Sequence, residues 1–490
     1  MKRHVENAAR QERRPPGDSV QIAFSDKAWI RLIRTPVFLM NPTSVQILAT
    51  VLFALAVLHT FCVKRFAHWA HGYPEGSVGE NVLHFLSETE IVIGVWAAIL
   101  VIGIAILSGS VHEAVAYVEK LGGSADSASV EKLGSVPEAV TYVKGLTDSY
   151  KEPKFVMVVM IVAATRPVVN LAELIILWIA RLLPMRESVS FYIAALSFGC
   201  LFGSFITEPA AMTLLAMLLR RRYFDQNISK MLAYATIGLL FVNVSIGGTL
   251  THFAAPPVLM VAAKWDWGTW FMASTFGWRA AASCLCSTLV VTLCFWKQLN
   301  AVEVDKPEPQ LIPAWLTSLH LVFLGAVVAF AHHPDVFFGI FMIFLGLVVA
   351  TQEYQDPLKL KEGLLVGFFL AGLVTLGSLQ DYWLRPLIIS LDGAELYFGA
   401  TALTAITDNA ALTFLGSQVE GIKPELKYAL VAGAVTGGGL TVIANAPNPA
   451  GTGILQTSKA FGSGGIHPVG LFLGATPPTL MAIAFFWFIG

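Results

Sequence analysis

The chain has 490 residues, of which 55% are apolar and 13% are Asp, Glu, Lys or Arg, whereas soluble domains average about 25% charged residues. Its formal net charge is −1, so no basic surface favours nucleic acid as a partner. With long apolar runs and a mean hydropathy of +0.66, the composition excludes a soluble enzyme. It predicts an all-α polytopic membrane protein whose partner is the lipid bilayer.

The chain begins with a polar, basic stretch, and we expect residues 1–43 to be a tail without a cleavable signal peptide. Ten apolar runs close to membrane-spanning length follow. They cover residues 44–63, 91–109, 155–183, 230–262, 279–296, 314–331, 336–351, 364–391, 427–457 and 468–489.

Polar segments divide these runs into two membrane repeats. Residues 44–297 form the first repeat, which carries a polar insert at 110–153, and residues 314–490 form the second repeat. A polar connector at 298–313 joins the two repeats. We expect short amphipathic helices in the insert.

Two further apolar stretches are each interrupted near their middle by a polar, acidic tetrapeptide. This pattern predicts two half-helices that meet at a re-entrant tip rather than a full span. We name them hairpin one, residues 190–219, and hairpin two, residues 395–419. Residues 204–215 of hairpin one match hairpin two at an offset of 200, with six of twelve positions identical. This alignment places Glu208 opposite Asp408.

A second internal match lies in Gly- and Pro-rich stretches inside two of the spans. We name these stretches the first break, residues 248–257, and the second break, residues 438–447; they align at an offset of 190. The chain therefore reads as a duplication, with five spans and one hairpin in each copy. Because an odd number of crossings inverts the second copy, we expect inverted-topology repeats with discontinuous helices around one central site.

The two tip carboxylates, Glu208 and Asp408, are the candidate functional groups. An ionised carboxylate near mid-membrane costs about 2.5–3.5 kcal/mol, so a proton or a cation should neutralise it. A structural hydrogen-bonding role is the alternative for either group. Hydroxyl and amide oxygens nearby suit Na⁺ or Li⁺, which favour hard oxygen ligands. These expected ligands are Thr207, Thr407, Asn409, Thr251, Thr441, Asn445 and Asn448.

Between the two carboxylates, the sequence favours Asp408 as the main group shared by Na⁺ and H⁺. Asp408 lies beside Asn409, and we expect it to face Asn445 and Asn448, whereas Glu208 lies beside Pro209. We therefore predict Na⁺ sites at both tips, with the stronger coupling at Asp408.

Two further sets of charged residues lie inside predicted spans. Arg166 and Glu173 flank a proline in the run at 155–183, and Asp381 and Arg385 are four residues apart in the run at 364–391. We expect each set to form a charge pair, with either a structural role or a role as a charge relay.

Three motifs of the second repeat resemble the ion transporter superfamily, and within it the bacterial sodium/proton antiporters. They are Thr-Asp-Asn-Ala-Ala-Leu-Thr at 407–413, the glycine triplet and Ala-Asn-Ala-Pro-Asn-Pro within 437–449, and the Phe-Phe-Leu-Ala-Gly-Leu run at 368–379. The resemblance implies a secondary active transporter in the bacterial inner membrane, commonly a homodimer. It implies no cofactor beyond the transported Na⁺ or Li⁺ and H⁺.

Two other functions stay open at this point. The same superfamily includes Na⁺-coupled carboxylate and other anion carriers, which typically have a Ser-Asn-Thr tip, whereas the tips here read Thr-Glu-Pro at 207–209 and Thr-Asp-Asn at 407–409. Two carboxylates would repel an anion, so cation/proton antiport is favoured. A membrane-embedded enzyme is disfavoured because the chain has no HExxH, GxSxG or paired Asp-rich motif.

Overall fold

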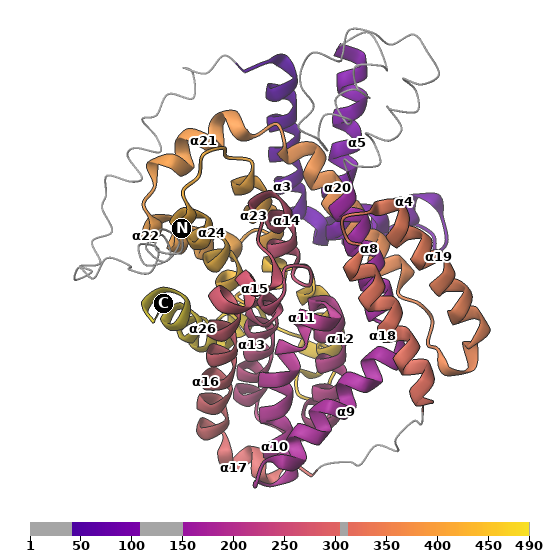
Figure 1. Cartoon of the computed structure of the whole chain (residues 1–490), viewed down its shortest axis with the longest axis vertical. Helices are drawn as coiled ribbons and strands as arrows, with labels where there is room; N and C mark the ends of the chain where they lie inside the picture. Colours follow the sequence, from indigo (N-terminus) through magenta and orange to yellow (C-terminus); the bar gives the residue numbers. More distant parts are fainter. Residues whose placement is uncertain (1–41, 108–149, 304–311, 490) are drawn as a thin grey trace, which may run out of the picture.

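The computed structural model describes residues 42–107, 150–303 and 312–489. Every regular element in these ranges is a helix, which confirms the predicted all-α class (Figure 1). Most of the predicted tail at 1–43 and of the insert at 110–153, and half of the connector at 298–313, lie outside the described residues.

Five helical stretches are long and apolar enough to cross a membrane. They contain α3 (Ser44–Ala70), α13 (Lys230–Gly247), α15 (Thr269–Met272) with α16 (Trp278–Cys294), α20 (Leu360–Gly377) and α26 (Pro468–Ile483). Two shorter apolar helices, α18 (Ala314–Ala329) and α19 (Pro334–Ala350), pack against each other. Except for the short α15, each of these helices overlaps a predicted span.

Two predicted spans are broken rather than continuous. The run at 155–183 forms α8 (Lys151–Ala163) and α9 (Arg166–Leu182), which are bent by 66° relative to each other. Pro167 near the start of α9 has no N–H to continue the helix, which explains the break. The run at 364–391 divides into α20 and α21 (Asp381–Ser390), and α4 (Val78–Leu86) meets α5 (Thr89–Leu107) at another sharp bend.

Both hairpins are interrupted at their predicted tips. Hairpin one consists of α10 (Glu187–Ala194), a π-helical turn, α11 (Gly203–Ile206) and α12 (Glu208–Leu219). Hairpin two consists of α22 (Gly393–Thr404) and α23 (Asn409–Ser417). The first break separates α13 from α14 (Pro256–Trp265), and the second break separates α24 (Pro424–Gly437) from α25 (Asn448–Leu455). The sequence therefore located all four interruptions.

The hairpins and breaks of the two halves pack crosswise. Helix α12 of hairpin one packs against α25, which follows the second break, and α23 of hairpin two packs against α14, which follows the first break. Within each half, a glycine brings the broken helix close to its own hairpin. A Cβ atom at Gly247 would lie 2.6 Å from the Cys200 carbonyl oxygen, and one at Gly437 would lie 2.4 Å from the Thr401 carbonyl oxygen. Side chains from both halves therefore meet where the helices are interrupted.

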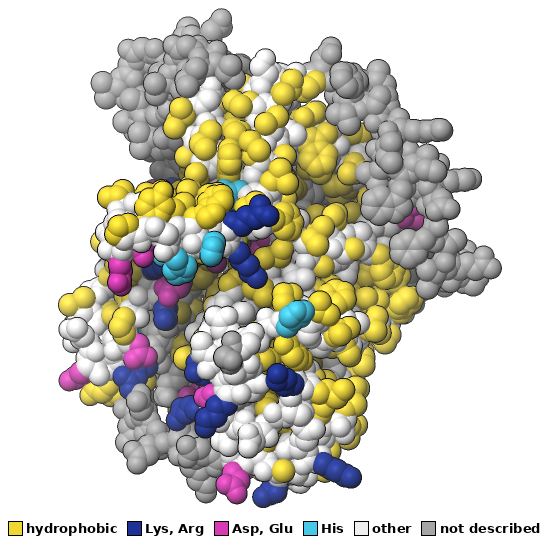
Figure 2. All heavy atoms as spheres, turned by 180° about the vertical axis from the view of Figure 1, so that it is seen from behind, with side chains coloured by type: hydrophobic (Ala, Val, Ile, Leu, Met, Phe, Trp, Pro, Cys, Tyr) yellow, Lys and Arg dark blue, Asp and Glu magenta, His cyan; other side chains and the backbone are white. Residues whose placement is uncertain are grey.

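The outer surface is strongly apolar. Large side chains such as Val322, Ile343 and Leu473 are mostly exposed, and apolar residues cover much of the face shown in Figure 2. An exposed apolar surface of this kind suits contact with lipid.

Candidate functional site

The two hairpin tips begin their second helices at positions that differ by one residue. Thr207 caps α12, and its carbonyl accepts from Ala211 N at 3.0 Å. Asp408 caps α23, and its carbonyl accepts from Leu412 N at 3.2 Å. By helix position, the counterpart of Glu208 is therefore Asn409. The alignment that placed Glu208 opposite Asp408 is wrong by one residue in the structure.

Asp408 is an N-cap. Its Oδ1 atom accepts hydrogen bonds from Ala410 N at 2.8 Å and from Ala411 N at 3.1 Å, and the residue is partly exposed. A carboxylate in this position satisfies amides that the helix leaves unpaired, and the helix dipole favours its negative charge. The Asp408 carboxylate is thus held by the first turn of its own helix, and it also interacts with the backbone of Ala446 in the second break.

Glu208 has a different environment. Its side chain is fully buried, and its Oε2 atom accepts a hydrogen bond from Asn445 Nδ2 at 3.0 Å. Its Oε1 atom is buried without a hydrogen-bond partner among the described residues. A Cβ atom at Gly248 would lie only 2.4 Å from this oxygen, so the first break makes room for the carboxylate. The Glu208 carboxylate therefore lies against both breaks.

The residue before Glu208 has an unusual backbone. Thr207 has a φ of 74°, in a region that non-glycine residues rarely adopt. Its side chain is 2% exposed, and its hydroxyl has no hydrogen-bond partner within the described parts of the chain. Strained backbone of this kind is retained where the surrounding structure requires it, often at functional sites. Thr207 therefore adds a second buried polar side chain directly before Glu208 in the chain.

Three buried asparagines complete the centre. Neither polar atom of the Asn409 amide has a described hydrogen-bond partner, and a Cβ atom at Gly438 would lie 2.9 Å from Asn409 Nδ2. Asn448 Nδ2 donates to Gly438 O at 2.8 Å. The Oδ1 atoms of Asn445 and Asn448 are buried and lack a partner in the described structure. Buried polar atoms without partners are rare, and a bound ion is one of their explanations.

The structure divides the second break between the two carboxylates, with the Ala446 backbone against Asp408 and the Asn445 side chain against Glu208. The second break does supply Asn445 to a carboxylate, but that carboxylate is Glu208. The crosswise packing of α12 against α25 accounts for this pairing, because it brings hairpin one to the second break. The order of residues in the sequence does not indicate that Asn445 of the second half contacts hairpin one of the first half.

Three of the predicted threonine ligands are engaged in hydrogen bonds that hold the backbone. The Thr251 hydroxyl donates to Ser204 O at 2.6 Å, and the Thr441 hydroxyl donates to Ala405 O at 2.8 Å. Each of these bonds ties a break to the hairpin of its own half. Thr407 donates to Leu403 O at 2.8 Å within hairpin two. These hydroxyls fix the geometry around the centre.

The predicted charge pairs have additional neighbours. Arg166 Nη1 lies 3.8 Å from Asp356 Oδ1, and Glu173 lines the same cavity as Arg166. Arg385 Nη1 lies 3.8 Å from Glu420 Oε2, although Arg385 also interacts electrostatically with Asp381. Both arginines thus lie near an acidic residue outside the predicted pairs.

A cavity of about 1300 Å³ reaches the tip of hairpin one. Thr207 and Pro209 line it together with Ala446 and Pro447. Its walls also carry charged residues of both signs, including Glu88, Glu90, Glu173, Arg181, Arg221, Arg222, Lys361 and Glu362. The cavity therefore connects the neighbourhood of Glu208 with charged groups elsewhere in the molecule.

Sequence reasoning missed Glu90, which lies in the first turn of α5 and lines this cavity. Glu90 interacts electrostatically with Asp408. In the sequence, Glu90 is visible only as an acidic residue directly before an apolar run. Such residues are also common at helix starts, where the helix dipole favours a negative charge. Only the packing of α5 in the fold distinguishes the two roles.

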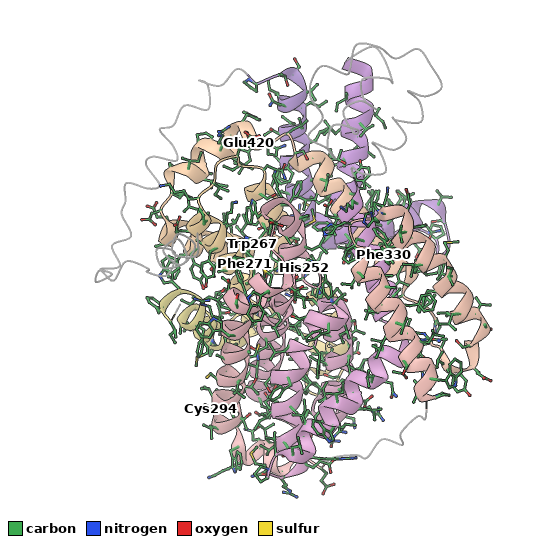
Figure 3. The ribbon with its side chains drawn as sticks, in the orientation of Figure 1. His252, Trp267, Phe271, Cys294, Phe330 and Glu420 are labelled. Carbon is green, nitrogen blue, oxygen red and sulfur yellow. The ribbon has the colours of Figure 1, made fainter. Side chains whose placement is uncertain are left out.

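The described residues contain no group of three or more His, Cys, Asp or Glu side chains that could hold a metal ion. His252, which lies in the first break, has its Nδ1 atom 2.7 Å from the Thr269 hydroxyl. Thr269 lies in sequence between Trp267 and Phe271, whose rings are tilted by 32° at a centroid distance of 4.8 Å; Figure 3 labels these two residues and His252.

The sequence model of one protein family, described as "Putative Na+/H+ antiporter", matches residues 44–122 and 128–489. A search of curated protein sequences finds no match. The family match spans nearly the whole chain, and the apolar helices agree with a protein that crosses the membrane several times. The chain therefore belongs to this family of putative Na⁺/H⁺ antiporters and is a multi-pass membrane protein for ion transport.

Proposed function

We propose that the protein exchanges Na⁺ or Li⁺ for H⁺ and that Glu208 is the carboxylate for which the two ions compete. The observation that carries this proposal is the burial of Glu208 with one oxygen hydrogen-bonded to Asn445 and the other without a described partner. Family membership supports the exchange reaction, and the geometry around Glu208 supports the assignment of the residue.

The chemistry follows from the cost of burying a charge. An ionised carboxylate inside the membrane is unfavourable unless a proton or a cation compensates it. Oε1 of Glu208 and Oδ1 of Asn409, Asn445 and Asn448, which have no hydrogen-bond partner among the described residues, are hard oxygen ligands suited to a small alkali cation. When the cation binds, the proton leaves, and the reverse holds, so each ion lowers the affinity for the other.

The cavity beside hairpin one provides a route to this centre. Its lining reaches Thr207 directly before Glu208, and its charged side chains, which include Glu90 and Glu173, are balanced between acidic and basic groups. We assign the second access route to the opposite side of the membrane by the expected inverted repeat. The crosswise packing of hairpins and breaks supports such a repeat.

Asp408 has a supporting role in this proposal. Because its Oδ1 atom is bound to two amides of α23, Asp408 anchors the start of that helix and contributes negative potential near the centre. A buried carboxylate at Glu208 also opposes the binding of an anionic substrate. Uptake of labelled succinate or citrate driven by Na⁺ would favour the symporter alternative instead.

Vesicles reconstituted with the purified protein test the proposal. With an acidic lumen and a pH-sensitive dye inside, external Na⁺ or Li⁺ should raise the luminal pH, whereas choline should not. Because H⁺ competes for the same group, the apparent KM for Na⁺ should fall as the external pH rises. No response to Na⁺, Li⁺ or K⁺ at any pH would contradict the proposal.

The family resemblance also supports a proposal for the membrane in which the protein works and one for its oligomeric state. We propose that the protein works in a bacterial inner membrane, which fractionation of expressing cells tests. We also propose a homodimer, and mass measurement in detergent tests it: a monomer mass would contradict that expectation.

A further inference from the structure

Glu208 and Asn409 lie in equivalent surroundings in the two halves. Each is the first residue of the second half-helix of its hairpin. Gly248 and Gly438 are equivalent positions of the two breaks, and each makes room for one of these side chains. A Cβ atom at Gly248 would lie 2.4 Å from Glu208 Oε1, and one at Gly438 would lie 2.9 Å from Asn409 Nδ2. The two halves thus present a carboxylate and a neutral amide at matching places.

The side chains that meet Asn409 at Gly438 are also neutral, and the one acidic neighbour, Asp408, interacts electrostatically with Glu208. Ser245 Oγ lies beside Gly438 and donates to Val435 O at 2.8 Å, and Asn448 Nδ2 donates to Gly438 O. Asp408 is adjacent in sequence, but its Oδ1 atom accepts from two amides of α23. Of the pair formed by Glu208 and Asn409, only the first can release a proton.

We infer that the antiporter is electroneutral and that Asn409 is the residue that sets this charge balance. The inference rests on the proposed function of Glu208. In one direction a Na⁺ ion binds the Glu208 carboxylate, and in the other direction a proton binds the same carboxylate. One positive charge moves each way per cycle, so no net charge crosses the membrane.

A carboxyl group in place of the Asn409 amide breaks this balance. In Asn409→Asp, the added carboxyl group also binds a proton, and both protons leave when one Na⁺ ion binds between the two carboxylates. Each cycle then carries more protons than Na⁺ ions, and the membrane potential becomes a driving force. Asn409→Gln keeps a neutral amide and should stay electroneutral, whatever its rate.

The test uses full-length protein in vesicles whose potential is set with K⁺ gradients and valinomycin. Na⁺-driven H⁺ movement by the wild type should have the same rate at zero and at imposed potential. Asn409→Asp should become faster or slower by several-fold, according to the sign of the potential. Asn170→Asp is the matched control, because it adds a carboxyl group to the cavity wall away from Gly438, and it should stay insensitive to potential.

The outcomes separate the inference from the proposed function. A wild-type exchange rate that changes several-fold with potential would overturn electroneutrality while leaving Na⁺/H⁺ exchange established. Potential-insensitive exchange by an active Asn409→Asp would overturn the role of Asn409. If the wild type shows no Na⁺-dependent H⁺ movement at any potential, the proposed function fails, and the inference fails with it. The wild-type measurement alone decides electroneutrality even if Asn409→Asp does not fold.

Discussion

The two hairpins have the same architecture but use their acidic residues differently. Hairpin one places Glu208 as the first residue of α12, where it is fully buried and bonded to Asn445 of the other half. Hairpin two places Asp408 one position earlier, where it caps α23. A shift of one residue at a helix start therefore separates a carboxylate that stabilises its own helix from one available to an ion.

The two positions differ in how much of the cost of a buried charge is offset locally. An ionised carboxylate at membrane depth costs about 2.5–3.5 kcal/mol on insertion scales at either tip. At Asp408 the N-cap bonds offset about 1 kcal/mol of that cost. Glu208 has no such cap, so its retention in the centre points to function.

The largest effect on the exchange rate should come from a substitution of Gly248, which packs against the Glu208 carboxylate of hairpin one. In Gly248→Ala the added Cβ would lie 2.4 Å from Glu208 Oε1, so the carboxylate must move. We expect the exchange rate to fall at least ~10-fold, equivalent to about 1.4 kcal/mol of transition-state stabilisation. Gly399→Ala in hairpin two, where an added Cβ meets nothing within 4 Å, is the control. Equal rates for the two variants in the vesicle assay would refute the crowding argument.

The amide from the second break should have the next largest effect. Asn445→Ala removes the hydrogen bond to Glu208, and a bond to a charged group contributes about 1.5–3 kcal/mol. We expect the apparent KM for Na⁺ to rise ~10-fold or more at constant pH. Na⁺ titrations of the initial rate measure it. A KM equal to that of the wild type would show that Asn445 does not support the binding carboxylate.

In hairpin two, substitution of Asp408 should mainly change the stability of the folded protein. Asp408→Ala removes the cap of α23 and should destabilise the protein by about 1 kcal/mol, whereas Asp408→Asn keeps a good capping side chain. Thermal unfolding in detergent compares both variants with the wild type. An Asp408→Ala variant that unfolds at the wild-type temperature would contradict the capping role.

The smallest effect is expected in the wall of the cavity. Glu90→Gln removes one negative charge that attracts cations, so the apparent KM for Na⁺ should rise about twofold at low ionic strength. The difference should shrink at high ionic strength because salt screens such interactions. Loss of exchange in this variant would instead give Glu90 a direct part in binding.

The helical class, the hairpins and the breaks could be predicted from the sequence, because apolar length and interrupting polar or glycine residues have direct physical consequences. The helix register at the tips could not be predicted from the matching residues. Sequence identity aligns Thr207 with Thr407. The residue at which each helix begins, however, is set by the preferences of nearby residues for the cap and the first turn. Pro209 suits the first turn of α12, and Asp408 is itself a strong N-cap.

The residues that contact each hairpin tip could not be predicted from the sequence either. Asn445 bonds to Glu208 across 237 positions, and this contact exists only because α25 packs on hairpin one. The prediction for Asp408 assumed that the Asn445 side chain faces the hairpin of its own half. Likewise, the electrostatic interaction between Glu90 and Asp408 depends on tertiary packing and carries no local sequence signal.

The central claim is that Glu208, rather than Asp408, couples Na⁺ to H⁺, and a paired measurement tests it directly. Glu208→Gln and Asp408→Asn each remove one charge with little change in shape. In vesicles with matched protein content, Na⁺-driven alkalinisation should be abolished in Glu208→Gln and should persist in Asp408→Asn. Wild-type exchange by Glu208→Gln, or loss of exchange in Asp408→Asn alone, would contradict the account.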